Sequence, residues 1–159
     1  QLSIERYALA ETEIHASLRF LSTNPTFSEA PIVNPPADAL VLLTNGIGGM
    51  VRMCVDLGRI ESKYDCVLGA NLHATLPTDR HIFAKRIRVW LNADGFITPL
   101  NLQNLVSVSP GPPAVWNFAA KVGDERTVEI KLTADMLGGK NTTVFRFELG
   151  RAALPRSPN

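Results

Sequence analysis

The sequence predicts an all-β protein, built as an antiparallel β-sandwich. Three observations support this prediction. Apolar residues alternate with polar ones at a period of two, glycine and proline turn signals separate the alternating runs, and the runs recur at short spacing. Strands buried on one face produce this alternation because successive side chains point to opposite faces of a sheet. A chain of 159 residues is long enough for one such domain with its own core, and too short for two.

Residues 1–38 are predicted to add a strand and a connector to this same domain. Residues 14–20, IHASLRF, alternate apolar and polar side chains and predict the strand. A short helix is predicted just before it, over residues 7–13, because an Ala-Leu-Ala run favours helix there. The prolines of residues 24–38 predict an extended connector.

Residues 39–150 are predicted to form the core of the sandwich. The clearest alternating runs are residues 83–91, 128–132 and 143–149. In the first run Lys85 interrupts the apolar face, and Trp90 lies on the outer face with the arginines. The side chains predicted to face the core in the three runs are Phe83, Ile87, Val89 and Leu91, then Val128, Ile130 and Leu132, then Thr143, Phe145, Phe147 and Leu149.

Turn residues separate the predicted strands. Asp94-Gly95 lies between two apolar runs and predicts a hairpin, and Gly123-Asp124 and Gly138-Gly139 predict two more turns. Three prolines within residues 110–113 exclude a central strand at that point. Residues 151–159 are predicted to be a tail or linker.

One stretch needs more than a turn to explain it. In VLLTNGIGGMVRMCVDLGR, residues 41–59, three glycines fall within positions 46–49, between two apolar runs. Asn45-Gly46 alone supplies the positive φ that a tight turn needs. The surplus glycines therefore predict either an unusually close backbone approach or a docking surface.

Composition and charge exclude several classes of function. The net charge of +1 gives no electrostatic reason to expect a nucleic-acid or membrane partner. No apolar run approaches the roughly 20 residues that span a bilayer, and no signal peptide is seen. The chain opens on Gln1 and ends with a proline-containing tail, so we expect a fragment of a longer protein. Cys54 and Cys66 are predicted to be reduced, in a cytoplasmic protein.

No catalytic, metal or cofactor site is predicted from motifs. His15, His73 and His81 lack metal-ligand spacing, and the glycine stretch fits neither a phosphate-binding loop nor a dinucleotide fingerprint. The sequence also lacks the nucleophile elbow of serine hydrolases. Carboxylates that could pair in space as a glycosidase acid and base are Asp56, Glu61, Asp65 and Asp79. Aromatic side chains that could stack on sugar rings are Tyr64, Trp90 and Trp116.

Residues 42–72, LLTNGIGGMVRMCVDLGRIESKYDCVLGANL, resemble the start of the amino-side β-domain of bacterial and archaeal glycogen debranching enzymes of the amylo-α-1,6-glucosidase type. The family's Thr-Asn-Gly-x-Gly-Gly motif is matched by Thr44, Asn45, Gly46, Gly48 and Gly49. Its second motif is matched in part. Lys63 and Tyr64 stand where a basic residue and Tyr are expected, while Asp65 and Cys66 replace a His-Gly pair. The resemblance extends over about residues 40–149.

The resemblance implies a large sandwich like those of galactose mutarotase and the glucoamylase-type hydrolases. In such enzymes the sandwich precedes an (α/α)6 barrel that holds the catalytic carboxylates, and this chain lacks that barrel. The expected function is a non-catalytic domain that supports or docks the barrel, with no turnover of its own. The residues expected to contact the barrel or carbohydrate are Thr44, Asn45, Gly46, Gly48, Gly49, Lys63, Tyr64, Asp65, Trp90 and Trp116.

Two other hypotheses remain open at this point. The first is an α-glucan-binding module that holds sugar through Tyr64, Trp90 or Trp116. The second is an aldose-epimerase-like enzyme on the same fold, which would need a catalytic histidine and carboxylate. The spacing of residues in the sequence does not support such a pair.

Overall fold

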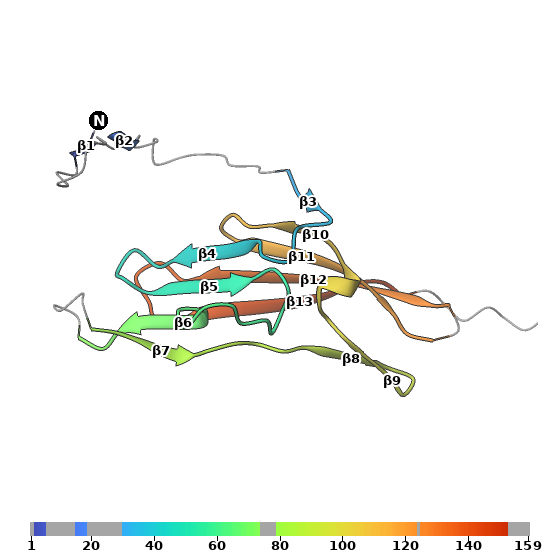
Figure 1. Ribbon diagram of the computed structural model, residues 1–159. Coiled ribbons are helices and arrows are strands. Elements are labelled where there is room, and N and C mark those ends of the chain that lie inside the picture. The colour runs from blue at the N-terminus through green and yellow to red at the C-terminus, as the bar shows by residue number, and fades with distance from the viewer. Residues whose placement is uncertain (1, 6–14, 19–29, 74–78, 124, 153–159) are drawn as a thin grey trace, which may run out of the picture.

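The structure, a computed structural model, describes residues 2–5, 15–18, 30–73, 79–123 and 125–152 (Figure 1). These ranges contain thirteen strands and a single 3-10 turn, η1 (Leu102–Asn104), and no α-helix. The all-β prediction is therefore confirmed. The predicted helix over residues 7–13 lies outside the described residues. Across the described ranges, no helix is long and apolar enough to cross a bilayer.

The strands form two main antiparallel sheets and two hairpins. The strands are β1 (Leu2–Glu5), β2 (His15–Leu18), β3 (Ile32–Val33), β4 (Leu40–Thr44), β5 (Met50–Cys54), β6 (Cys66–Asn71), β7 (Arg80–Ala84), β8 (Trp90–Ala93), β9 (Phe96–Pro99), β10 (Leu105–Ser109), β11 (Ala114–Lys121), β12 (Thr127–Met136) and β13 (Thr143–Ala152). One sheet has five strands in the order β13-β12-β11-β10-β3, and the other has four in the order β4-β5-β6-β7. The strands β1 and β2 pair with each other, as do β8 and β9.

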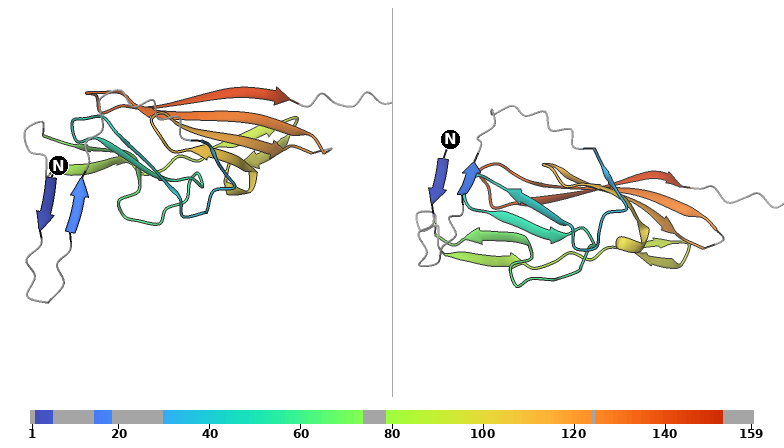
Figure 2. Two further views of the ribbon diagram at one scale, coloured as in Figure 1. Left: turned by 90° about the horizontal axis from the view of Figure 1, so that it is seen from above. Right: turned by 45° about the horizontal axis from the view of Figure 1, so that its top comes forward.

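The two main sheets lie face to face, as Figure 2 shows, and this confirms the predicted antiparallel sandwich. Their inner faces supply one continuous apolar core. Trp116 of β11 lies within it with no exposed surface, and its indole Nε1 donates a hydrogen bond to the Val55 carbonyl at 3.1 Å. Burial of this core is the main source of stability, because apolar area removed from water dominates folding.

The predicted alternation holds fully in β12 and only in part in β13. Val128, Ile130 and Leu132 are buried, as predicted. Phe147 and Leu149 of β13 were predicted to be buried too, but they are 47% and 69% exposed. The prediction is wrong for these two because β13 is the edge strand of its sheet. Their partners in β12, Leu132 and Ile130, are buried, whereas Phe147 and Leu149 border an open groove beside Val89–Leu91.

The predicted continuous strand over residues 83–91 is divided in the structure. β7 ends at Ala84, and β8 begins at Trp90. Phe83, predicted to face the core, is 56% exposed, while its neighbour Ala84 packs against the core. A register shift between β6 and β7 at Leu68 accompanies this reversal. From residue 85 onward the predicted faces are correct, since Ile87, Val89 and Leu91 pack against the core.

The predicted turns are present at each position that the structure describes. Asp94 and Gly95 have φ values of 50° and 87° and join β8 to β9. Gly123 and Gly139 also have positive φ and lie in the turns before and after β12. The connector is more structured than predicted, because β3 within it pairs with β10 at the edge of the five-stranded sheet.

Candidate docking site

The Thr-Asn-Gly-x-Gly-Gly motif forms the turn between β4 and β5, at one end of the sandwich (Figure 1). The β12–β13 turn and the end of β6 lie at this same end. One backbone bond closes the β4–β5 turn and another joins it to the β12–β13 turn. The Asn45 N–H donates to the Gly49 carbonyl at 3.4 Å, and the Gly139 N–H donates to the Asn45 carbonyl at 2.8 Å.

The Asn45 side chain ties the two turns together. It is 3% exposed, and its Oδ1 accepts hydrogen bonds from the N–H groups of Ile47 at 3.0 Å and Gly49 at 2.8 Å. Its Nδ2 donates to the Lys140 carbonyl at 3.0 Å and to Asn141 Oδ1 at 2.8 Å. All four bonding positions of the amide are therefore used, two within its own turn and two across to the other.

Each of the three glycines has a separate local cause. Gly46 and Gly48 have φ values of 79° and 93°, a region that residues with a Cβ rarely adopt. At Gly48 a Cβ would also lie 2.5 Å from Asn71 Nδ2. Gly49 is buried, and a Cβ there would lie 2.7 Å from Asn45 Cγ and 2.9 Å from Asn141 Oδ1.

This geometry gives the surplus glycines a cause within the chain itself. Gly49 is needed because the side chains of Asn45 and Asn141 occupy the space beside it. The N–H groups of Ile47 and Gly49 already donate to Asn45 Oδ1. The close approach predicted from the sequence is present, but it occurs within this chain.

The turn presents apolar side chains outward. Ile47, at its tip, is 55% exposed, and Leu72, directly after β6, is 58% exposed. The two belong to the same end because the Asn71 side chain lies against Gly48. Thr44 and Gly46 are also exposed. Sequence reasoning missed Ile47 and Leu72 as candidates, although Ile47 is the one large side chain inside the motif.

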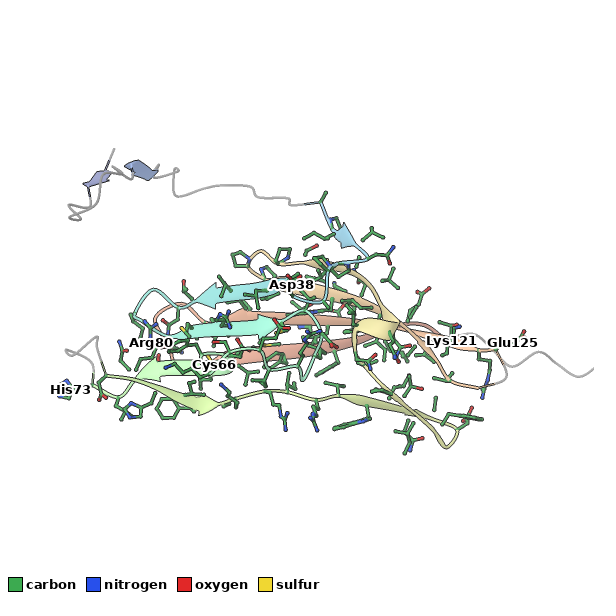
Figure 3. The ribbon with its side chains drawn as sticks, in the orientation of Figure 1. Asp38, Cys66, His73, Arg80, Lys121 and Glu125 are labelled. Carbon is green, nitrogen blue, oxygen red and sulfur yellow. The ribbon has the colours of Figure 1, made fainter. Side chains whose placement is uncertain are left out.

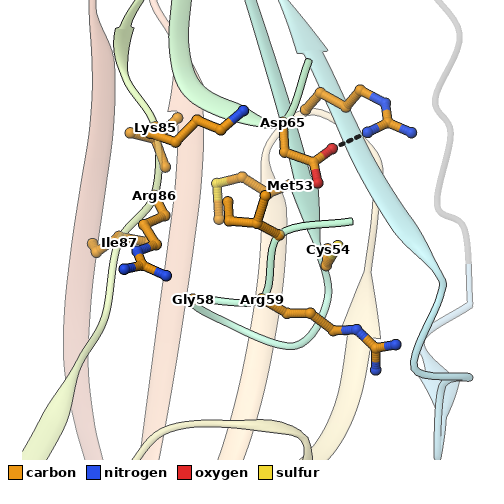
Figure 4. A pocket seen from close by; sticks show the side chains of 11 residues that line it. Met53, Cys54, Gly58, Arg59, Asp65, Lys85, Arg86 and Ile87 are labelled. Carbon is orange, nitrogen blue, oxygen red and sulfur yellow. Dashed lines mark hydrogen bonds and ion pairs between the residues drawn. The ribbon is translucent and has the colours of Figure 1, made fainter. Parts of the chain in front are cut away.

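The second motif lies in the loop between β5 and β6, and only part of it is accessible. Tyr64 is 58% exposed, with Lys63 Nζ 5.0 Å from its ring centroid. Asp65 is 1% exposed and forms an ion pair with Arg52 (Figure 4). Its other oxygen accepts from the N–H groups of Glu61 at 2.7 Å and Ser62 at 2.8 Å.

These contacts exclude Asp65 as a residue that touches a ligand or a neighbouring domain directly. Its carboxylate is fully used in holding the 61–65 loop against β5. Lys85 supports the same loop, since its Nζ donates to the carbonyls of Ser62 at 3.2 Å and Lys63 at 2.6 Å. Asp65 is thus a structural residue, which corrects the prediction.

The aromatic candidates do not form a common platform. Trp116 is completely buried, so its ring cannot stack on a sugar, and this candidate is wrong. Trp90 is 57% exposed, as its outer position predicted. It borders a groove of about 350 Å³ whose lining is apolar apart from Glu148. The lining residues are Val89, Trp90, Leu91, Leu100, Ile130, Phe147, Glu148 and Leu149.

The remaining polar candidates lie apart from one another. His81 and Asp79 form an exposed local pair, with 3.3 Å between Nδ1 and Oδ1. Glu61 pairs with Arg59, and Asp56 Oδ1 accepts from the Leu102 N–H at 2.9 Å. His73 follows Leu72 and lies at the end of the sandwich where β6 ends (Figure 3). The side chain of His15 is outside the described part. Among the described side chains, no three His, Cys, Asp or Glu residues are grouped to hold a metal ion.

Both cysteines are buried free thiols, as the sequence predicted. Burial raises the pKa of the Cys54 thiol, and the nearby negative charge of Glu61 adds to that shift. Burial likewise raises the pKa of Cys66. Neither thiol is therefore an activated nucleophile, because such cysteines have a lowered pKa and partial exposure.

Comparison of the chain with protein-family models, with curated proteins and with solved structures finds no match.

Proposed function

We propose that this chain is the non-catalytic β-sandwich domain of a glycogen-debranching-type glycoside hydrolase. In this proposal the domain docks an (α/α)6 catalytic domain through the end that carries Thr44–Gly49. The observation that supports it is the turn held by Asn45, which presents Ile47 on a loop fixed by the hydrogen bonds of the Asn45 side chain. A fixed loop loses little conformational entropy on binding, so it suits a permanent contact between domains.

Ile47 and Leu72 are the side chains assigned to this contact. Both are more than half exposed, and both lie at the end where the resemblance to the debranching family is strongest. Burying a fully exposed aliphatic side chain contributes about 1.5–3 kcal/mol, so two of them make a useful core for a contact. Exposed Thr44 and Gly46 would lie at its rim.

The test of docking compares two substitutions in the longer polypeptide that the proposal requires. Ile47→Asp should lower its catalytic turnover and melting temperature, while leaving the stability of the isolated 159-residue chain unchanged. Ile97→Asp is the matched control, because Ile97 is 67% exposed and belongs to the β8–β9 hairpin. Equal effects of the two substitutions on the longer protein would contradict docking through the Thr44–Gly49 end.

The test of the non-catalytic role uses this chain alone. It should release no glucose from a branched dextrin, and it should bind maltooligosaccharides no better than millimolar, about −4 kcal/mol. Glucose release by the purified chain would overturn the proposal. Micromolar sugar binding that is lost in Trp90→Ala would instead support an α-glucan-binding module.

A further inference from the structure

The last strand of the five-stranded sheet is an open edge. β13 is ten residues long and, among the described strands, pairs with β12 alone. The opposite edge of this sheet is β3, which has two residues and lies close to Pro31 and Pro35. Soluble proteins commonly shorten edge strands or place proline there, because unpaired N–H and C=O groups invite another strand. β3 fits this description, whereas β13 is long and contains no proline.

The inner face of this edge is apolar and only partly covered. Phe145 packs against the core, but Phe147 and Leu149 follow it at 47% and 69% exposure. The pairing with β12 is regular from Thr143 to Leu149, and the register shifts only beyond that point. A regular run of this length can accept a new strand without local rearrangement.

The outer face of the same run carries two opposite charges. Arg146 lies across from Thr133, and Glu148 lies across from Lys131, with 3.4 Å between Lys131 Nζ and Glu148 Oε2. Within the described part of the chain, no ion pair of Arg146 is seen. A strand added to this edge would therefore be favoured if it placed an acidic residue opposite Arg146 and a basic residue opposite Glu148.

We propose that a second copy of this chain supplies that strand, with the two β13 strands pairing antiparallel about a two-fold axis at Phe147. Each Arg146 then lies opposite Glu148 of the second copy. On the inner face Phe147 meets its own counterpart, and Phe145 lies opposite Leu149 of the second copy. Residues directly opposite in an antiparallel pair share a face, so all five pairs are matched in character.

Neighbouring registers that keep the faces matched are less favourable. An axis at Arg146 would place the two Arg146 side chains opposite each other, and an axis at Glu148 would do the same with two glutamates. Like charges directly opposite destabilise a sheet. In the Phe147 register, β13 is thus complementary in charge and apolar character to β13 of a second copy. For this reason a second copy, rather than an unrelated segment, is the occupant of the edge.

Sedimentation equilibrium over a range of concentrations tests the dimer and its charge pairs. The chain should dimerise. Arg146→Glu should raise the dimer dissociation constant about tenfold, because both charge pairs become repulsive. The double variant Arg146→Glu/Glu148→Arg should restore dimerisation, since the pairs are re-formed with exchanged signs. Lys121→Glu, on exposed Lys121 of β11, is the control and should have no effect. A chain that stays monomeric, or a double variant that does not recover, would overturn the proposal.

Cysteine cross-linking tests the register directly. Opposite residues have Cβ atoms about 4.5–5.5 Å apart, so Phe147→Cys should form an intermolecular disulfide under a mild oxidant. Val144→Cys should not, because the two Val144 positions lie about 20 Å apart along this pair. Cross-linking of Val144→Cys, or its absence in Phe147→Cys, would contradict the Phe147 axis. Since Ile47→Asp lies away from this edge, it should leave dimerisation unchanged, so this proposal and the docking proposal can fail separately.

Discussion

Asn45 and Lys140 are joined by a hydrogen bond that spans 95 positions of the sequence. The Asn45 Nδ2 donates to the Lys140 carbonyl at 3.0 Å, and a backbone bond from Gly139 to the Asn45 carbonyl lies beside it. The first turn of the four-stranded sheet is thereby fixed to the last turn of the five-stranded sheet. The two layers of the sandwich are thus joined at their end by polar contacts as well as by the apolar core.

Replacing Asn45 by alanine should destabilise the chain by about 2–4 kcal/mol, because it removes four hydrogen bonds and leaves buried partners unsatisfied. Urea unfolding followed by circular dichroism measures this loss. Asn92→Ala is a suitable control, since Asn92 Oδ1 makes one exposed bond, to the Gly95 N–H. If both variants lose the same stability, Asn45 does not tie the turns together.

The glycines of the same turn should respond differently to alanine. Gly46→Ala should lower the free energy of unfolding by about 1 kcal/mol, because Gly46 has a positive φ, which alanine disfavours. No steric penalty adds to this, since the space around Gly46 is open. Gly49→Ala should lower the free energy of unfolding by more, about 1–3 kcal/mol at least, because the new methyl group would overlap the side chains of Asn45 and Asn141. Thermal unfolding of the two variants gives the order. A smaller effect at Gly49 would show that Asn45 can move aside easily.

Asp65→Asn should destabilise the chain by about 1–3 kcal/mol, although it preserves the shape of the side chain. It removes the charge that pairs with Arg52 and replaces one of the two oxygens by an NH2 group, which must then face either the Arg52 guanidinium or the N–H groups of Glu61 and Ser62. Equilibrium unfolding measures the loss, and Asp94→Asn is the control because its pairing with Arg126 involves a carboxylate that is 74% exposed. An Asp65→Asn variant as stable as the parent chain would contradict the structural role.

The stability of the chain should fall as the pH rises above about 9, the ordinary pKa of both thiols. Burial raises the pKa of Cys54 and Cys66 in the folded chain, so the unfolded chain loses these protons first as the pH rises. Stability is therefore fully present below that pH and is lost above it, until the folded thiols also ionise. Urea unfolding at pH 8 and pH 10 tests this. The double variant Cys54→Ala/Cys66→Ala should show a smaller decline, and an unchanged decline would assign it to other groups.

The strands could be predicted from the sequence wherever their faces are decided locally. Val128, Ile130 and Leu132 alternate with polar residues, and they are buried because β12 has a neighbour on each side and a sheet over its inner face. Phe147 and Leu149 show the same alternation in sequence. They are exposed because β13 is the edge strand and borders a groove, and the position of a strand within its sheet is a property of the assembled fold that leaves no trace in the local pattern.

The turn at Thr44–Gly49 was found by motif, but Ile47 and Leu72 were missed as the exposed apolar residues at its end of the sandwich, and the roles of Asn45 and Asp65 could not be predicted. Asp65 and Trp116 belong to types that often bind ligands, and their burial follows from partners elsewhere in the fold, such as Arg52 and the Val55 carbonyl. Its sequence neighbours alone predict only that Asn45 is a turn residue. Its bonds to Lys140 and Asn141 could not be anticipated, because nothing near position 45 indicates which distant segment will lie beside it.

The split of the Asn45 bonds between near and distant partners has a consequence for folding. Its Oδ1 accepts from residues two and four positions away, so this half of the turn can form as soon as the β4–β5 hairpin does. Its Nδ2 must wait until the β12–β13 hairpin has folded, since closing so long a loop comes late and slows folding. The turn is therefore held by all four bonds of Asn45 only once the sandwich is complete. The exposed surface around Ile47 reaches its final shape only in a chain that has folded throughout.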